Sequence, residues 1–115
     1  MITLYGIPNC DTVRKARKWL TENNIEHRFH NFKKESLEQQ ILEQWVEALG
    51  WEVLLNKRGM TWRKLADEVK ADIDQHKAIQ IMLENTSIIK RPVLDKNKTF
   101  YVGFKEELYQ SLFQP

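Results

Sequence analysis

The fold is decided by the opening stretch ITLYGIPNCDT, residues 2–12. Residues 2–5 are apolar and partly β-branched, which is typical of a short buried strand, and residues 6–8 end that strand with a glycine and a proline. After Cys10 the pattern changes, because apolar residues recur at helical spacing from Val13 to Leu20. The stretch therefore predicts a strand, a tight loop and a helix that starts at Cys10.

The next segment extends this pattern into a three-element unit. Asn23 and Asn24 end the predicted helix, and residues 26–32 have the character of an extended strand. A strand, a helix and a second strand in this order form a βαβ unit. The two strands of such a unit pair in parallel.

The middle of the chain, about residues 36–85, is predicted to be a helical insertion. Ser36 and Asp72 each begin a capping-box pattern, Thr61 is expected to cap a shorter helix, and Gly50 stands where a helix should end. Helical spacing of apolar residues continues between these signals. We expect this segment to interrupt the sheet-forming parts of the chain rather than to contribute strands.

The end of the chain returns to strands. Residues 91–94 and 99–102 are short strand-like runs around the polar turn of residues 95–98, which predicts an antiparallel hairpin. An amphipathic helix is expected to follow and to reach Phe113. The whole pattern predicts a single α/β domain over residues 1–115, with a mixed four-stranded sheet.

Composition narrows the classes of function. The 115 residues carry 18 basic and 16 acidic side chains, a net charge of only +2, so we expect no direct binding to nucleic acid. No apolar run is long enough to cross a membrane, and no signal peptide is recognised. A single cysteine cannot form an internal disulfide. The cysteine and the three histidines do not have the sequence spacing of a recognised zinc site. We expect a cytoplasmic monomer without metal.

Cys10 is the residue that points to chemistry. At a helix start the unpaired backbone N–H groups stabilise a thiolate, and Arg14 follows one turn later as a candidate cation. Asn9 and Thr12 are candidate hydrogen-bond donors around the sulfur, whereas a carboxylate at Asp11 would oppose the thiolate. The alternative is that Cys10 is a small buried hydrophobe with no reactivity.

Three motifs of the chain resemble the ArsC/Spx superfamily, and its YffB-like branch in particular. They are ITLYGIPNCDT at residues 2–12 with RKA at 14–16, NKRGMTWRKL at 56–65, and IIKRPV at 88–93. The motifs occur in the family's order and the resemblance spans nearly the whole chain. It implies a thioredoxin-like fold with a helical insertion, a redox-active Cys10, and a cis bond between Arg91 and Pro92 beside the thiol.

The resemblance also implies two functions. Family members that reduce arsenate use a cysteine, glutathione and three arginines. Here Arg91 matches one of these arginines, Asn56 stands at the second with Arg58 nearby, and Gly103 stands near the third. We therefore do not expect efficient arsenate reduction. The first hypothesis is a monothiol reductase that uses glutathione or glutaredoxin, with Arg14, Arg58 and Arg91 stabilising the thiolate or an anion. The second is an Spx-like regulator that binds a protein such as RNA polymerase.

Overall fold

The computed structural model describes residues 1–114, which form two compact units. The first consists of Met1–Glu35 together with the chain from Arg91 onward, and the second is Ser36–Lys90. The helical insertion expected at about residues 36–85 thus extends to Lys90. Whether the chain counts as one domain stays a prediction.

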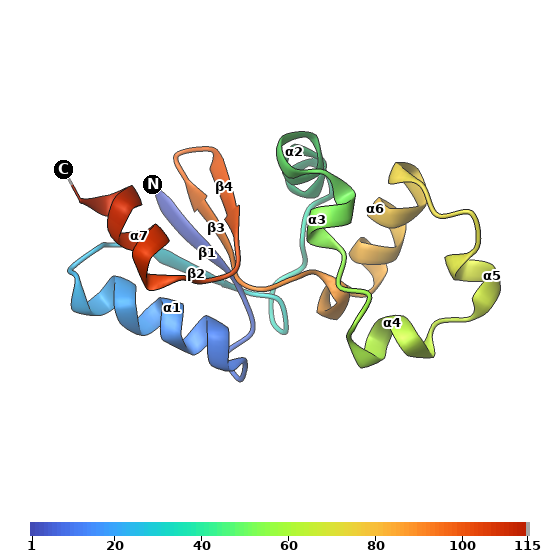
Figure 1. Ribbon diagram of the computed structural model, residues 1–115, viewed down its shortest axis with the longest axis horizontal. Coiled ribbons are helices and arrows are strands. Elements are labelled where there is room, and N and C mark those ends of the chain that lie inside the picture. The colour runs from blue at the N-terminus through green and yellow to red at the C-terminus, as the bar shows by residue number, and fades with distance from the viewer. Residues whose placement is uncertain (115) are drawn as a thin grey trace. The chain divides into compact units, whose positions relative to one another are not determined.

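The first unit is built on a mixed four-stranded sheet of order β2-β1-β3-β4 (Figure 1). Its strands are β1 (Ile2–Gly6), β2 (Arg28–Asn31), β3 (Val93–Lys96) and β4 (Thr99–Val102). β1 pairs with β2 in parallel and with β3 antiparallel, and β3 and β4 form an antiparallel hairpin. The predicted βαβ unit, the hairpin and the mixed α/β sheet are confirmed.

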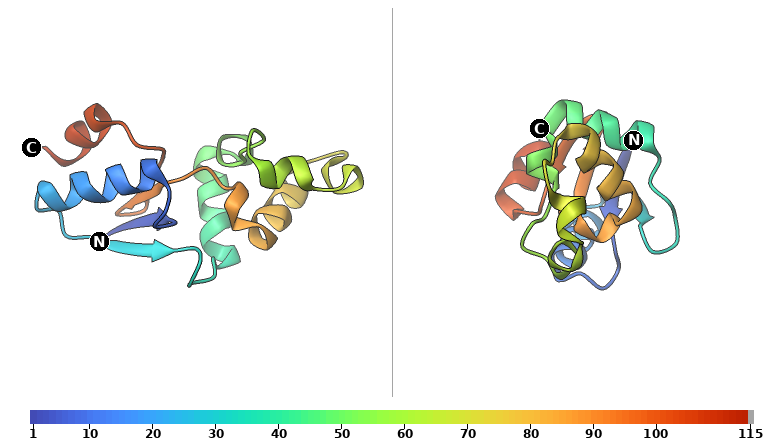
Figure 2. Two further views of the ribbon diagram at one scale, coloured as in Figure 1. Left: turned by 90° about the horizontal axis from the view of Figure 1, so that it is seen from below. Right: turned by 90° about the vertical axis from the view of Figure 1, so that its right-hand side faces the viewer.

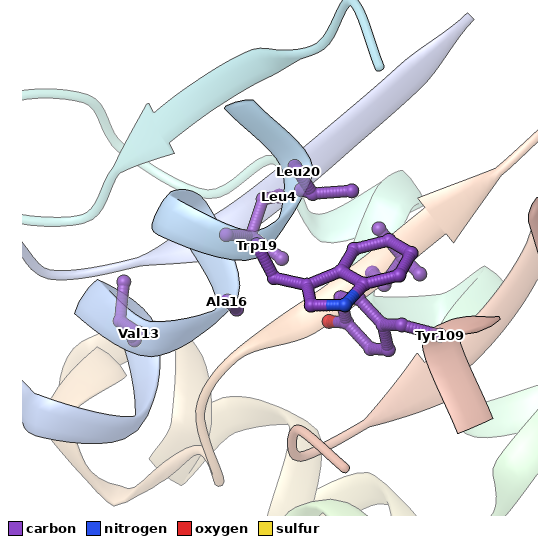
Figure 3. Packing of buried hydrophobic residues seen from close by; sticks show 7 residues of the cluster. Leu4, Val13, Ala16, Trp19, Leu20 and Tyr109 are labelled. Carbon is purple, nitrogen blue, oxygen red and sulfur yellow. The ribbon is translucent and has the colours of Figure 1, made fainter. Parts of the chain in front are cut away.

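Two helices, α1 (Asp11–Glu22) and α7 (Glu106–Phe113), cover one face of this sheet (Figure 2). The core between them and the sheet contains Leu4, Leu20 and Leu94, all fully buried. In Figure 3 the Trp19 ring meets the Tyr109 ring, edge to face with centroids 5.6 Å apart. Edge-to-face contact is a favoured arrangement of aromatic rings, and here it packs α7 against α1. The helix that begins after Cys10 is therefore held on a rigid core.

The second unit is wholly helical apart from short connections. Its elements are α2 (Gln39–Leu49), α3 (Trp51–Leu54), α4 (Met60–Lys64), α5 (Asp67–Lys70), α6 (Gln75–Glu84) and the 3-10 turn η1 (Thr86–Ile88). α2 packs against α6, and Trp45, Leu42 and Met82 are fully buried there. Gly50 ends α2 at a φ of +90°, a conformation that favours glycine, so the predicted helix end is confirmed.

The predicted starts of three helices in this unit are wrong. α2 begins at Gln39 rather than Ser36, because the chain is still extended at Glu38. Asp74, not Asp72, caps α6: its side chain accepts the Lys77 N–H at 2.9 Å.

The short helix expected to start at Thr61 differs for a separate reason. The Thr61 hydroxyl bonds that of Ser87 at 2.8 Å instead of capping a helix, and the chain forms two pieces, α4 and α5. Neither piece buries a residue, so no apolar face favours a continuous helix.

No helix within residues 1–114 combines the length and the apolar character that a membrane crossing requires.

Candidate functional site

Cys10 lies at the N-terminal cap of α1, where the loop after β1 turns into the helix. Its backbone is extended (φ −97°, ψ 127°), as a cap position requires, and its carbonyl accepts the Arg14 N–H at 2.9 Å. The thiol is partly buried and packs against the edge of the core. The side chain is therefore open to a reactant while its backbone is fixed by the helix.

Gly6 lets the end of β1 approach α1 closely. A methyl group at this position would lie 2.7 Å from Val13 Cγ2 and 3.2 Å from Val13 Cγ1, closer than packed atoms allow. Val13 is fully buried, so its side chain has no room to move away. Glycine at position 6 thus sets how the first turn of α1 seats against the strand.

The surroundings of the Cys10 sulfur favour its charged form. Partial burial alone would raise the pKa of the thiol, but three groups outweigh it: the Val13 N–H, the Arg91 guanidinium and the Thr12 N–H. The thiol does not make a hydrogen bond of standard cap geometry, yet these N–H groups face the sulfur and stabilise a negative charge there. Together they hold the pKa of Cys10 below its usual range.

Arg91 and Pro92 belong to the segment just before β3, the strand that pairs with β1 in the middle of the sheet. β1 and β3 run antiparallel, with Tyr5 opposite Val93, so the residues just before β3 lie beside the end of β1. The bond between Arg91 and Pro92 is cis, as the resemblance implies, and Pro92 is buried. The Pro92 carbonyl accepts the Gly103 N–H at 2.8 Å. The pairing of β1 with β3 places the Arg91 guanidinium beside the Cys10 sulfur.

The other candidate site residues of the first unit are Arg14, Asn9 and Thr12, and each has a different position relative to the sulfur. The Arg14 guanidinium pairs with the Asp11 carboxylate, which lies in the same turn of α1. Asn9 is exposed in the turn before Cys10. Thr12 contributes to the sulfur through its backbone N–H rather than through its hydroxyl.

Arg58 belongs to the second unit. It is exposed, and its N–H donates to Asn56 Oδ1 at 3.1 Å. With Lys57, Lys90 and Glu52 it lines a hollow of about 390 Å³ within that unit. A role for Arg58 in anion binding stays a prediction.

Two contributors were missed from the sequence. The sequence pattern shows Val13 only as an apolar residue of the helix, but its N–H contributes most among the groups that lower the pKa of the Cys10 thiol. The signal was available, because the N–H groups two and three residues after a cap face the cap side chain. The sequence does not indicate the role of Gly6, because the close contact between Gly6 and Val13 depends on how α1 packs against β1.

No metal centre accompanies this site: residues 1–114 bring no three His, Cys, Asp or Glu side chains together as metal ligands.

The mixed sheet of order β2-β1-β3-β4, with α1 and α7 packed on it, has the thioredoxin-like α/β fold that the resemblance implies. The ArsC family model matches residues 5–112, and the chain belongs to the ArsC family. The resemblance identified from the three motifs is confirmed.

Three relatives illustrate the range of this family. A solved structure of a YFFB protein is 43% identical, with a TM-score of 0.93, over 96% of this chain and 97% of that one. An uncharacterized protein of Haemophilus influenzae is 45% identical over 98% of this chain and 99% of its own length. The global transcriptional regulator Spx of Streptococcus agalactiae is 30% identical over 93% of this chain and 79% of its own length.

Proposed function

We propose that the protein is a glutathione-linked monothiol reductase whose nucleophile is Cys10. The observation that carries this proposal is the position of Cys10 at the N-terminal cap of α1. Partial burial raises the pKa of the thiol there, but the Val13 and Thr12 N–H groups and the Arg91 guanidinium outweigh it and lower the pKa. A thiolate is the attacking form in disulfide exchange, so a lowered pKa raises the fraction ready to react near neutral pH. Membership of the ArsC family supports the same hypothesis, a reductase that acts through Cys10.

The proposed cycle consists of two exchanges. The Cys10 thiolate attacks the glutathione sulfur of a mixed disulfide, the old S–S bond breaks, and the substrate leaves as a thiolate that takes a proton from water. A glutathione thiolate then attacks the glutathione sulfur now bound to Cys10, which releases the Cys10 thiolate and oxidised glutathione. Glutathione supplies the electron pair. Glutaredoxin is the alternative thiol for the second exchange.

An outside thiol is required because the chain offers no second one. Cys10 is the only cysteine of the sequence, and the position three residues later, where an internal partner would stand, is the fully buried Val13. An intramolecular disulfide is therefore excluded, and each turnover must end by exchange with another molecule.

The direct test is reduction of a glutathionylated peptide by glutathione, with and without the protein. We expect acceleration by the wild type, a glutathione adduct on Cys10 by mass spectrometry, and neither with Cys10→Ser. Circular dichroism checks that this variant is folded. Equal rates for wild type and Cys10→Ser would exclude the reductase.

The similarity to the transcriptional regulator Spx favours a second candidate, a module that binds a protein partner such as RNA polymerase without catalysis. Exposed cations of α1, among them Arg14 and Lys18, would contribute to such a surface. Purified RNA polymerase retained equally by wild type and Cys10→Ser would support this candidate. Absence of binding by both would count against it.

A further inference from the structure

One side of α1 carries a row of cations that begins next to Cys10. With 3.6 residues per turn, Arg14 and Arg17 follow Cys10 by about one and two turns, so they lie on the same side of the helix as the thiol. Arg14, Arg17 and Lys18 line a surface hollow of about 490 Å³ with Thr21 and Glu22. We call this feature the α1 hollow.

The positive charge of the α1 hollow is only partly compensated. Arg14 pairs with Asp11, whereas the Arg17 guanidinium lies 4.1 Å from the centre of the Phe29 ring. This stacking holds the guanidinium in place and leaves its charge unneutralised. Lys18 is exposed and forms no ion pair within residues 1–114. Glu22 also lines the hollow, so three cations stand against the carboxylates of Asp11 and Glu22, and the hollow keeps a net positive charge in the turns of α1 that follow Cys10.

The α1 hollow also has a length that suits a short peptide. A helix rises about 1.5 Å per residue, which places Arg14 roughly 6 Å and Lys18 roughly 12 Å along the axis from Cys10. An extended peptide advances about 3.3–3.6 Å per residue, so two to four residues cover this range. A peptide whose sulfur meets Cys10 could thus place carboxylates near Arg17 and Lys18.

We propose that the α1 hollow binds the carboxylate-bearing part of the peptide disulfide that Cys10 attacks, and so selects anionic over neutral disulfides. This inference rests on the proposed reductase function and adds its substrate class. Charge in the hollow raises the local concentration of anionic reactants, and salt screens that effect. Arg17 and Lys18 act as specificity residues for the first exchange, and they do not change the thiol itself.

The test measures how fast Cys10 is converted to a mixed disulfide by three probes of different charge. The probes are oxidised glutathione (anionic), hydroxyethyl disulfide (neutral) and cystamine (cationic), followed by mass spectrometry at low and high salt. The double variant Arg17→Gln/Lys18→Gln removes the two cations of the hollow. The control Lys15→Gln/Lys105→Gln removes the same charge from exposed positions that do not line it.

We expect the hollow variant to react about three- to tenfold more slowly with oxidised glutathione at low salt, and about as fast as wild type with the neutral probe. High salt should remove most of the difference, and the control should resemble wild type. Equal slowing in hollow and control variants, or none in either, would overturn the inference while leaving the reductase intact. No reaction of Cys10 with any probe would overturn both.

Discussion

The Arg91 guanidinium lies beside the Cys10 sulfur and helps to lower the pKa of this thiol, although the two residues lie near opposite ends of the sequence. They meet because β3 pairs antiparallel with β1, which brings the residue before Pro92 to the loop that starts α1. The cation beside the thiol thus comes from a distant segment, while Arg14, the nearby cation in sequence, pairs with Asp11.

This arrangement predicts that Arg91→Gln raises the pKa of Cys10, because it removes both a charge and a hydrogen bond from the thiolate. Arg14→Gln is the matched control and should leave the pKa near the wild-type value. The measurement is the ultraviolet absorbance of the thiolate as a function of pH, with Cys10→Ser as the blank because the three tyrosines also absorb when they ionise. A larger shift in Arg14→Gln than in Arg91→Gln would contradict the assignment.

The lowered thiol pKa also makes stability depend on pH. Cys10 binds its proton less tightly in the folded state than in the unfolded chain, whose thiol pKa is about 8.5. Wild type should therefore gain stability relative to Cys10→Ser as pH rises from the folded pKa towards about 8.5, and gain no more above that value. Urea unfolding of both proteins across this range tests the sign. A gain that appears only as pH falls would contradict it.

Gly6→Ala should destabilise the protein and disturb the thiol. The added methyl group would meet Val13 Cγ2 at 2.7 Å in a packed core, and overpacking of this kind costs about 1–3 kcal/mol. Relief requires the first turn of α1 to move, which would weaken the Val13 N–H contact with the sulfur. Chemical denaturation and the Cys10 pKa are the two readouts.

Gly59→Ala provides the comparison for that substitution. There the nearest atom is Asn56 Nδ2 at 3.2 Å, the end of a side chain that can turn away, so we expect a smaller loss of stability. An equal or larger loss for Gly59→Ala would mean that the contact between Gly6 and Val13 is not tight.

Lys98→Gly should stabilise the hairpin by about 0.5–1 kcal/mol, since glycine adopts a left-handed backbone without the strain that lysine bears. Asn97 and Lys98 form the turn between β3 and β4 with φ of +52° and +70°. The change removes the Lys98 ammonium from the buried Asp95 carboxylate, but the Lys98 side chain is mostly exposed, so this ion pair is worth little. The backbone N–H of residue 98, which donates to Asp95 Oδ1 at 2.8 Å, is kept. Lys96→Gly, at the last residue of β3, is the control and should destabilise. The free energy of unfolding tests both variants.

The parts of the fold that were predicted correctly depend on local patterns that packing reinforces. Residues 2–5 form a short apolar run and pair on both sides as a central strand, and the helix after Cys10 buries the apolar face that its spacing indicates. Cys10 could be recognised as the candidate nucleophile from its place between these two elements. The hairpin was recognisable for the same reason, because a polar turn separates two short apolar runs.

The parts that were not predicted depend on contacts between distant residues. Asp72 and Asp74 are equally good cap residues by type, but Asp72 has a φ of +52° and only Asp74 reaches the Lys77 N–H. Arg91 could be matched to the thiol only through the family resemblance, because strand pairing brings it there. The Val13 N–H and the close approach at Gly6 likewise belong to the packed structure.

The most direct test of the central claim, that Cys10 is held as a thiolate ready for exchange, is the rate of its alkylation by iodoacetamide as a function of pH, with Cys10→Ser as the blank. We predict an apparent pKa below about 8.5, the value of a free thiol, because the groups around the sulfur lower it. An apparent pKa at or above that value would contradict the claim and would favour a protein-binding module over a reductase.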